Sequence, residues 1–324
     1  MWDRVQDWRE RLRVAELPSL GLSVEGAAHA WAAALDSLDD NALSAASQVP
    51  GRPYASAGFI AASTVFTAPL EWCALLLGHG TPVALKLASA HADLVPVLQR
   101  TANAAGLPLS VSIDSEAAKS ADLLIAMGSD ATVRALERER SGRPFLGFGH
   151  RFSAAWIERA WEAIAQDLIV HDGYGCMSPV LIATPLPLDE AVDRMAEALA
   201  TWSARIPLGQ VAPADLAGIR SRQALARVVG RVASGTGWSV HGLPSKHWTP
   251  MALPRSIAVC SVASRADAWA MLAAHEPHLS TVADAEGHAW GSARVVLPGH
   301  MQRPPLDRVH DGVPVLSAVL RTTD

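Results

Sequence analysis

The sequence predicts an α/β fold built on parallel β-sheets. From Gly58 onward, short apolar segments alternate with longer amphipathic ones, which indicates strands and helices arranged in βαβ units. Half of the 324 residues are hydrophobic and only 18% are charged, so the chain can bury a large core and is not expected to be disordered. A chain of this length is expected to form two domains.

The first half of the chain is typical of a Rossmann-type nucleotide-binding domain. An amphipathic helix is expected over 2–16 and an Ala-rich helix over 27–38. Strands then follow over 58–66, 81–88, 107–113 and 121–128. The helices between and after them are expected over 68–80, 92–105 and 129–142, and each ends at or beside a glycine, a common helix terminator.

The second half repeats this alternation and predicts a second α/β domain. It begins with a strongly amphipathic helix expected over 152–168, which carries Trp156 and Trp161. Further helices are expected over 188–203, 219–232 and 265–275, and strands over 256–263 and 293–298. A glycine-containing segment near 150–153 marks the boundary. The domains are therefore expected to span 1–152 and 153–300, with a Pro-rich tail over 301–324 that packs back on the body.

Charge, hydropathy and cysteine spacing exclude several classes of protein. The net charge is −5, so the chain has no basic field for nucleic acid. The three cysteines are widely spaced, which argues against a disulfide-built secreted domain, and no zinc-type spacing predicts a metal site. The longest apolar stretch, 66–87, is interrupted by prolines, glycines and a glutamate, so no membrane span is expected. The charged, amphipathic N-terminus is not a signal sequence, and a cytoplasmic protein is expected.

Cys176 is the residue that points most directly to catalysis. It lies in His-Asp-Gly-Tyr-Gly-Cys-Met-Ser-Pro (171–179), between an expected helix and an expected strand, whereas Cys73 and Cys260 lie inside apolar elements. A nucleophilic thiolate needs an accessible loop, and neighbouring glycines let backbone N–H groups approach a substrate carbonyl. From spacing alone, a nucleophile and an ordinary loop cysteine are about equally supported.

Two further positions fit a nucleotide site. Lys86 ends an apolar strand, and the carboxyl ends of parallel strands face the crevice in which nucleotides bind. Gly128 and Ser129 join a strand to a helix, where glycine permits a tight turn and serine can cap the helix N-terminus that would hold a pyrophosphate. Taken singly, such a lysine is usually a surface residue, although lysine is rare in this chain and the strand is otherwise apolar. An ordinary strand–helix junction explains Gly128 and Ser129 better than a nucleotide site does.

Taken in order, four segments resemble the acyl-CoA reductase family of the bacterial luciferase operon, a branch of the aldehyde dehydrogenase superfamily. The segments are TVFTAPLEWCALLLGHGTPVALKLAS, ADLLIAMGSDATVRAL, FGHRFS and DGYGCMSP. With HEPHLSTVA and HDG near the end, the resemblance covers roughly residues 55–324. It implies an aldehyde-dehydrogenase-like fold, in which 1–152 form the dinucleotide-binding domain and 153–300 the catalytic domain.

The resemblance implies roles for individual positions. Cys176 matches the family's nucleophile. Lys86 matches the lysine that contacts the adenosine ribose, and Gly128 and Ser129 match the turn beneath the cofactor pyrophosphate. Pro69 matches the segment that borders the oxyanion site.

Three departures from the superfamily pattern affect the expected activity. Phe66-Thr67-Ala68 stands where an asparagine usually faces the oxyanion, so the backbone N–H of Cys176 and the Thr67 hydroxyl are expected to stabilise it. Phe148-Gly149-His150 stands where hydrolytic members carry a general-base glutamate, so a thioester intermediate is expected to survive for reduction. Ser89 stands where NAD-preferring members often carry an acidic residue, which favours NADPH and leaves NADH open.

The expected activity is NADPH-dependent reduction of an acyl thioester, carried by CoA or by an acyl carrier protein, to an aldehyde. His150 and His171 are the candidate proton donors. Two alternatives remain open. One is a cysteine-dependent acyltransferase on the same fold without redox chemistry. The other is a non-catalytic partner subunit, against which the joint presence of Lys86, Gly128-Ser129 and Cys176 argues.

Two features outside these blocks are left open by the sequence. His310-Asp311-Gly312 either orders the site or a subunit contact, or forms an ordinary C-terminal turn with Asp and Gly in turn positions. The chain is also shorter at its N-terminus than is usual in the family. The family's usual oligomer contacts are therefore not carried over, and homo-oligomer formation stays open.

Overall fold

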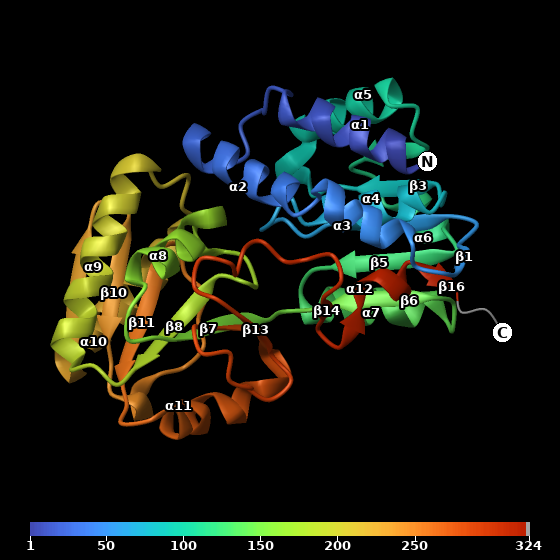
Figure 1. Cartoon of the computed structure of the whole chain (residues 1–324). Helices are drawn as coiled ribbons and strands as arrows, with labels where there is room; N and C mark the ends of the chain where they lie inside the picture. The colour runs from blue at the N-terminus through green and yellow to red at the C-terminus, as the bar shows by residue number, and fades with distance from the viewer. Residues whose placement is uncertain (322–324) are drawn as a thin grey trace. The chain divides into compact units, whose positions relative to one another are not determined.

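The computed structural model describes residues 1–321, which form two compact units (Figure 1). Unit 1 comprises residues 1–20, 30–150 and the described part of 303–324. Unit 2 comprises residues 21–29 and 151–302. The chain passes from unit 2 back to unit 1 within α2 (Val24–Asp36).

The core of unit 1 is a five-stranded parallel sheet with the order β4-β3-β2-β5-β6. Its strands are β2 (Ala57–Ile60), β3 (Val83–Lys86), β4 (Leu109–Ser112), β5 (Leu123–Met127) and β6 (Phe145–Phe148). The chain adds β3 and β4 on one side of β2 and then crosses to place β5 and β6 on the other side. This reversal puts a topological switch point between the carboxyl ends of β2 and β5, where ligands bind in open α/β sheets.

Helices cover both faces of this sheet. The helices that contact its strands are α4 (Pro69–Gly78), α5 (Val95–Ala104), α6 (Glu116–Ser120) and α7 (Asp130–Arg140). Helices α1 (Trp2–Arg13) and α3 (Asp40–Ser47) pack on α4, and α1 also packs on α5. Every residue of α4 except Glu71 is buried, because this helix contacts β3 as well as α1 and α3. Where α6 and α7 cover the sheet, Ala118 of α6 and Leu136 of α7 pack in one apolar core with Ile60 of β2 and Leu124 of β5.

The predicted strands and helices of the first half are confirmed, most of them with shorter bounds. Helix α2 begins three residues earlier than expected, and helices α3 and α6 were not anticipated. The strand expected over 58–66 ends at Ile60, and the chain then turns through exposed Ser63 and Thr64 before α4 begins. A 3₁₀ helix, η1 (Ser89–Leu94), precedes α5. The segment Phe145–Phe148, which the sequence indicated only as the end of the first α/β unit, is the fifth strand of the sheet.

The core of unit 2 is a seven-stranded sheet with the order β13-β12-β7-β8-β11-β10-β9. Its strands are β7 (Phe152–Trp156), β8 (Pro179–Thr184), β9 (Arg231–Gly235), β10 (Trp238–Gly242), β11 (Ser256–Ser261), β12 (Leu279–Asp284) and β13 (Arg294–Val296). All neighbours are parallel except β9, which pairs antiparallel with β10 at the sheet edge. Residues 236–237 join these two strands in a short hairpin.

Each face of the second sheet has its own apolar core. Helices α8 (Trp161–Ile169) and α9 (Leu188–Arg205) pack on one face around Ile164, Met195 and Val240. Helices α10 (Pro213–Val229) and α11 (Arg265–Leu272) pack on the other around Ala226, Leu272 and Leu181. Figure 1 shows α9 and α10 alongside β10 and β11.

The helix predicted over 152–168 is wrong. Residues Phe152–Trp156 form strand β7, and helix α8 begins only at Trp161. Strand β7 lies between β12 and β8, and its residues contribute to both cores: Phe152 and Ala154 to one and Ala155 to the other. Because β7 is covered on both faces, apolar and polar residues do not alternate along it as they do in a half-exposed strand. The segment was therefore mistaken for the start of a helix.

The helix predicted over 219–232 is shifted. Helix α10 begins at Pro213, which occupies a first-turn position where a missing N–H costs nothing, and it ends at Val229. Residues 231–232 belong to β9, and neither the β9–β10 hairpin nor β12 was anticipated. Gly235 and Gly237 lie between two short runs in which apolar and polar residues alternate, and this pattern could have predicted the hairpin.

The C-terminal segment returns to unit 1. It contains β14 (Val309–His310), β15 (Val313–Pro314), α12 (Val315–Ala318) and β16 (Leu320–Arg321). Strand β16 pairs antiparallel with β1 (Arg52–Pro53). Asp311 and Gly312 have positive φ angles of 48° and 85° and join β14 to β15, as a two-residue hairpin turn requires. The turn interpretation of His310-Asp311-Gly312 is confirmed at the level of the backbone.

Candidate active site

The carboxyl edge of the unit 1 sheet carries the residues predicted to bind a nucleotide. Lys86 is the last residue of β3, in register with Ile60 of β2, which is in turn in register with Ala126 of β5. The backbone N–H of Ala61 donates to the carbonyl of Lys86 over 2.9 Å. Half-buried Lys86 and the turn after β5 therefore lie at the same edge, one on each side of β2.

The turn after β5 leads directly into an eleven-residue helix, α7. Ser129 caps this helix, because its Oγ accepts the N–H of Thr132 over 3.1 Å. Gly128 does not have a positive φ, so the tight turn does not require glycine there. A Cβ at Gly128 would meet only Thr132, at 3.8 Å. The glycine instead leaves open space beside the helix N-terminus, as a group bound closely to the backbone needs.

Asp130, in the first turn of α7, is an acidic group that sequence reasoning missed. Its Oδ1 accepts the backbone N–H of His150 over 2.8 Å, which ties the segment after β6 to the start of α7. His150 therefore follows β6 at the same carboxyl edge, and its side chain is exposed. No local motif marks this contact, because the two residues are 20 positions apart along the chain.

The remaining predicted residues of unit 1 follow β2 and β3. Thr67 is buried in the segment between β2 and α4, and Pro69 is the first residue of α4. The carbonyl of Thr67 accepts the N–H of Leu70 over 3.0 Å. Ser89 is exposed at the start of η1, three residues after Lys86. All the predicted unit 1 residues thus lie in the segments that leave the carboxyl ends of β2, β3, β5 and β6.

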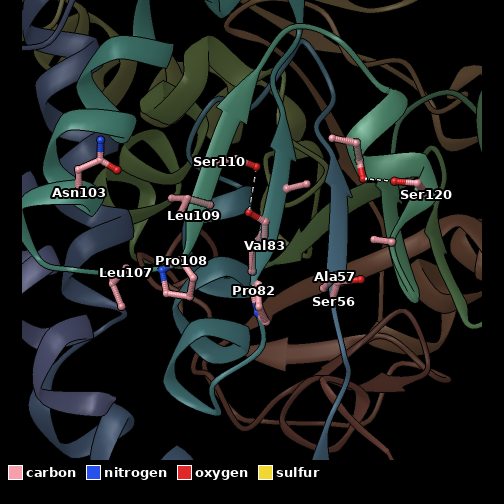
Figure 2. A pocket seen from close by; sticks show the side chains of 13 residues that line it. Ser56, Ala57, Pro82, Val83, Asn103, Leu107, Pro108, Leu109, Ser110 and Ser120 are labelled. Atoms are coloured by element: carbon pink, nitrogen blue, oxygen red, sulfur yellow. Dashed lines mark hydrogen bonds between the residues drawn. The ribbon is translucent and has the colours of Figure 1, made fainter.

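A surface pocket of about 510 Å³ lies at the opposite edge of the same sheet (Figure 2). It is formed where β2, β3 and β4 begin, with Ser56, Pro82 and Pro108 at their amino ends. Its lining is uncharged and consists mainly of small side chains, and it includes none of the residues predicted for the site.

Cys176 lies in a turn of unit 2, between the 3₁₀ helix η2 (Val170–Gly173) and β8, as the sequence predicted. The N–H of Ser178 donates to the carbonyl of Gly175 over 2.9 Å and closes a β-turn in which Cys176 is the second residue. The cysteine is half-buried, whereas Gly175 and Ser178 on either side of it are buried.

The two other cysteines are interior residues. Cys73 lies in α4 and Cys260 in β11, and both are fully buried. Burial raises the pKa of each thiol to about 12, so neither forms a thiolate at neutral pH. Among the cysteines, exposure therefore distinguishes Cys176 as the one that a reagent or substrate can reach.

The backbone just before the cysteine turn is left-handed over three residues in a row. His171, Asp172 and Gly173 have φ angles of 54°, 53° and 80°. The first two are not glycine, and such backbone costs of order 1–3 kcal/mol per residue unless its surroundings hold it. His171, one of the two candidate proton donors, is buried within this segment.

A buried ion pair holds this segment in place. Arg255 is fully buried, and its Nε donates to Asp172 Oδ1 over 2.7 Å. The other guanidinium nitrogens donate to the carbonyls of Ile206 and Pro207, and the N–H of Arg255 donates to the carbonyl of Asp172 over 2.9 Å. The N–H of Gly209 donates to the second carboxylate oxygen over 3.0 Å. The charged groups are thus paired and hydrogen-bonded within the interior.

Further hydrogen bonds fix the turn from α10, from β7 and from the loop that contains Gln302. Tyr174 Oη donates to Asp215 of α10 over 2.6 Å. Ser153 Oγ of β7 donates to the carbonyl of Cys176 over 2.8 Å, and Gln302 Nε2 donates to Ser178 Oγ over 2.8 Å. Sequence reasoning missed these partners and the Asp172–Arg255 pair, because they are far apart along the chain and no local motif marks them.

Two negative findings apply to residues 1–321. Among these residues, no group of three or more His, Cys, Asp or Glu side chains could hold a metal ion. No helix within the same range has both the length and the hydropathy that crossing a bilayer requires.

The sequence of the chain matches a known protein family. Residues 108–322, which include the β5–α7 turn and the Cys176 turn, match the acyl-CoA reductase (LuxC) family. The chain belongs to the acyl-CoA reductase (LuxC) family. As a member of this family it is an oxidoreductase. A comparison with curated protein sequences finds no match.

Solved structures similar to this acyl-CoA reductase family member are aldehyde dehydrogenases. Succinate-semialdehyde dehydrogenase from Burkholderia pseudomallei matches with a TM-score of 0.74 and 14% identity, over 99% of this chain and 84% of that one. An NAD-dependent benzaldehyde dehydrogenase from Corynebacterium glutamicum matches with a TM-score of 0.64 and 17% identity, over 87% and 73%.

A third similar structure is the NADP-dependent glyceraldehyde-3-phosphate dehydrogenase from Bacillus halodurans C-125 in complex with NADP. It matches with a TM-score of 0.67 and 13% identity, over 99% of this chain and 84% of that one. At these identities the likeness shows the fold, and the predicted aldehyde-dehydrogenase-like α/β architecture is confirmed.

Proposed function

We propose that this member of the acyl-CoA reductase family reduces an acyl thioester to the aldehyde, with NADPH as reductant and Cys176 as nucleophile. The observation that carries the proposal is the Cys176 turn. It presents a half-buried thiol on a backbone held by hydrogen bonds from several elements, whereas the thiols of Cys73 and Cys260 are buried. Family membership supports acyl thioesters as the substrate class.

The covalent steps follow from the thiol. The Cys176 thiolate attacks the carbonyl carbon of the acyl thioester, the bond from that carbon to the donor sulfur breaks, and the donor leaves as a thiol after taking a proton. The acyl group is then held on Cys176 as a thioester. Reduction by two electrons and one proton gives the alkoxide of a thiohemiacetal. Its carbon–sulfur bond then breaks, which releases the aldehyde and restores the Cys176 thiolate for the next cycle.

The carboxyl edge of the unit 1 sheet fits a dinucleotide. The switch point, the open space beside Gly128 and the N-terminus of α7 suit a pyrophosphate, and half-buried Lys86 suits a ribose. In this role unit 1, which holds most of the expected domain 1–152, binds the dinucleotide, and unit 2, which holds 153–300, is the catalytic domain. When bound, the nicotinamide cofactor supplies the hydride. Ser89 is exposed and has no carboxylate that would repel a 2′-phosphate. This supports NADPH as the cofactor, with NADH as the weaker alternative.

The remaining predicted residues have supporting roles in the proposal. The backbone N–H of Cys176 stabilises the oxyanion. The roles that the resemblance implies for Thr67 and Pro69 stay predictions. His150, which has an exposed side chain, donates the proton that the products require, with buried His171 as the second candidate. The segment Phe148-Gly149-His150 has no glutamate that could act as a general base and activate water. The proposed acyl-cysteine is therefore reduced and not hydrolysed.

The test is a loss of NADPH absorbance with a panel of acyl-CoAs and acyl carrier protein thioesters. We expect acyl-dependent oxidation of NADPH, formation of aldehyde, and loss of both in Cys176→Ala. Cys73→Ala, which removes a buried thiol, is the matched control and should keep its turnover. An acyl adduct on Cys176 by intact mass, with no NADPH oxidation, would instead identify the acyltransferase.

A further inference from the structure

One buried hydroxyl contacts the backbone of Cys176 directly. Ser153 is fully buried, and its Oγ donates to the carbonyl oxygen of Cys176 over 2.8 Å. A carbonyl that loses its partner in a buried place costs about 1–3 kcal/mol, so this bond favours one orientation of the peptide that follows the cysteine. That peptide is also the centre of the β-turn closed by Ser178 and Gly175.

The pairing of the strand that carries Ser153 changes register at this residue on both sides. Toward β8, Ser153 pairs with Pro179 but Ala154 pairs with Leu181, so the register shifts by one residue. Toward β12, Phe152 pairs with Leu279 but Ser153 pairs with Thr281, and the register shifts again. An extra residue bends the strand that contains it, and such irregularities are frequent beside active sites. The extra residues are Val180 of β8 and Ser280 of β12, so β7 itself continues without an insertion and Ser153 lies where both neighbouring strands change register.

We propose that Ser153 is a positioning residue for Cys176: its hydroxyl fixes the Cys176 carbonyl and thereby the direction in which the turn presents the thiol. The inference rests on the proposed function, in which Cys176 is the nucleophile. Ser153 does not touch the substrate, and it acts through the backbone of the cysteine. A thiol displaced by a fraction of an ångström attacks a carbonyl more slowly although the substrate binds as before.

The experiment compares Ser153→Thr with Ser153→Val in the full chain. The two side chains have the same shape and crowd the interior equally, but only threonine keeps the hydroxyl. We expect the valine variant to have a kcat for acyl-CoA-dependent NADPH oxidation about tenfold below that of the threonine variant, with the same KM for the acyl-CoA. Labelling of Cys176 by iodoacetamide, located by peptide mass, should also be slower in the valine variant.

Thr184→Val is the matched control. Thr184 is a buried hydroxyl at the opposite end of β8, where its Oγ1 accepts the N–H of Leu186 over 3.3 Å. This variant should lose thermal stability and keep both kcat and the labelling rate of Cys176. If neither β-branched variant at 153 folds, Ser153→Ala removes the hydroxyl without added volume, and we expect slower labelling of Cys176 than in the natural chain.

Equal kcat values and equal labelling rates in the valine and threonine variants would overturn the inference and leave Ser153 a purely structural hydroxyl. Labelling does not need the acyl substrate or NADPH. If the natural chain oxidised no NADPH, the proposed function would fail, while the labelling rates would still decide whether Ser153 positions Cys176.

Discussion

At the residue scale, the charges of the side chains beside the proposed cofactor site are expected to favour NADPH over NADH. Lys86 is half-buried at the end of β3, and Ser89 follows it at the exposed start of η1. A serine tolerates a nearby phosphate, whereas a carboxylate at the same position would repel it and would attract ribose hydroxyls. The choice between NADPH and NADH is therefore expected to depend on one side chain.

Ser89→Asp should reverse the cofactor preference. We expect kcat/KM with NADPH to fall at least about tenfold while kcat/KM with NADH is kept or improved, because the new carboxylate repels the 2′-phosphate. Ser120→Asp, which adds the same charge at the pocket on the amino edge of the sheet, should change neither value. An unchanged ratio in Ser89→Asp would show that the 2′-phosphate is not bound near this residue.

His241 shows how burial couples one residue to pH. It lies fully buried on β10, where burial and, to a lesser extent, the charge of Arg222 lower the pKa of its imidazole to about 3. In the unfolded chain the same group titrates near 6.5. Between these two values the unfolded state binds more protons than the folded state, so this residue makes the free energy of unfolding fall as the pH is lowered.

Asp167 contributes with the opposite sign in the same range. Burial raises the pKa of its carboxyl to about 7, although the N–H groups of Gly299 and Met301 favour the charged form. The folded state therefore holds this proton more tightly than the unfolded state. Its contribution to stability is fully present at low pH and is lost as the pH rises to 7.

The two contributions can be separated by difference curves. We expect the natural chain minus His241→Leu to lose up to about 1.4 kcal/mol of unfolding free energy per pH unit as the pH falls below 6.5. The natural chain minus Asp167→Asn should change in the opposite direction. Urea unfolding between pH 4 and 8 measures both curves. A flat curve for His241→Leu would mean that the imidazole stays solvated in the folded protein.

At the element scale, the Asp172–Arg255 pair joins η2 to the segment before β11. Its side chains are 3% and 0% exposed. Removal of one partner would leave the other as an uncompensated charge in the interior, beside three residues with positive φ. The pair is thus expected to determine the stability of the whole segment before the cysteine turn.

Arg255→Met should lower the free energy of unfolding by about 3–5 kcal/mol. The exposed pair Arg194–Glu190 within α9 provides the control, since its side chains are 51% and 41% exposed. Arg194→Met should therefore cost less than about 1 kcal/mol. Urea denaturation followed by circular dichroism compares the two, and equal losses would contradict the assigned role of the buried pair.

Secondary structure was predictable where one element has one buried face. Amphipathic helices α1 and α9 begin where the sequence indicated, because their apolar spacing and polar flanks are local properties. Strand β7 was missed because it is buried on both sides. The cover on its two faces comes from helices α8 and α11, which no local pattern around Phe152 reveals.

At the scale of the whole molecule, the C-terminal segment completes unit 1. Arg308 forms a two-pronged ion pair with Glu71 of α4, and the two side chains are only 4% and 13% exposed. The ring of His310 stacks on Phe148 with centroids 4.4 Å apart. Residues that are 237 positions apart therefore share one interior, and α4 depends on a partner from the end of the chain.

Arg308→Met should destabilise unit 1 by about 3 kcal/mol, because Glu71 would keep its charge in a nearly buried place. The tail should then be cleaved sooner by trypsin in limited proteolysis. Arg321→Met removes the cation of a pair that is 50% and 25% exposed and should cost less than about 1 kcal/mol. Equal cleavage rates in the two variants would show that the Glu71 pair does not hold the tail.

The sequence by itself determined the α/β class, the position of Cys176 between a helical segment and a strand, and the placement of Lys86 and Ser129 at strand ends. These are local properties, set by apolar periodicity and by glycine, proline and capping residues. The tertiary structure alone decided the order of the strands and the partners of the cysteine turn. Ser153 and Arg255 reach that turn only because strand order and register bring together residues that are distant along the chain.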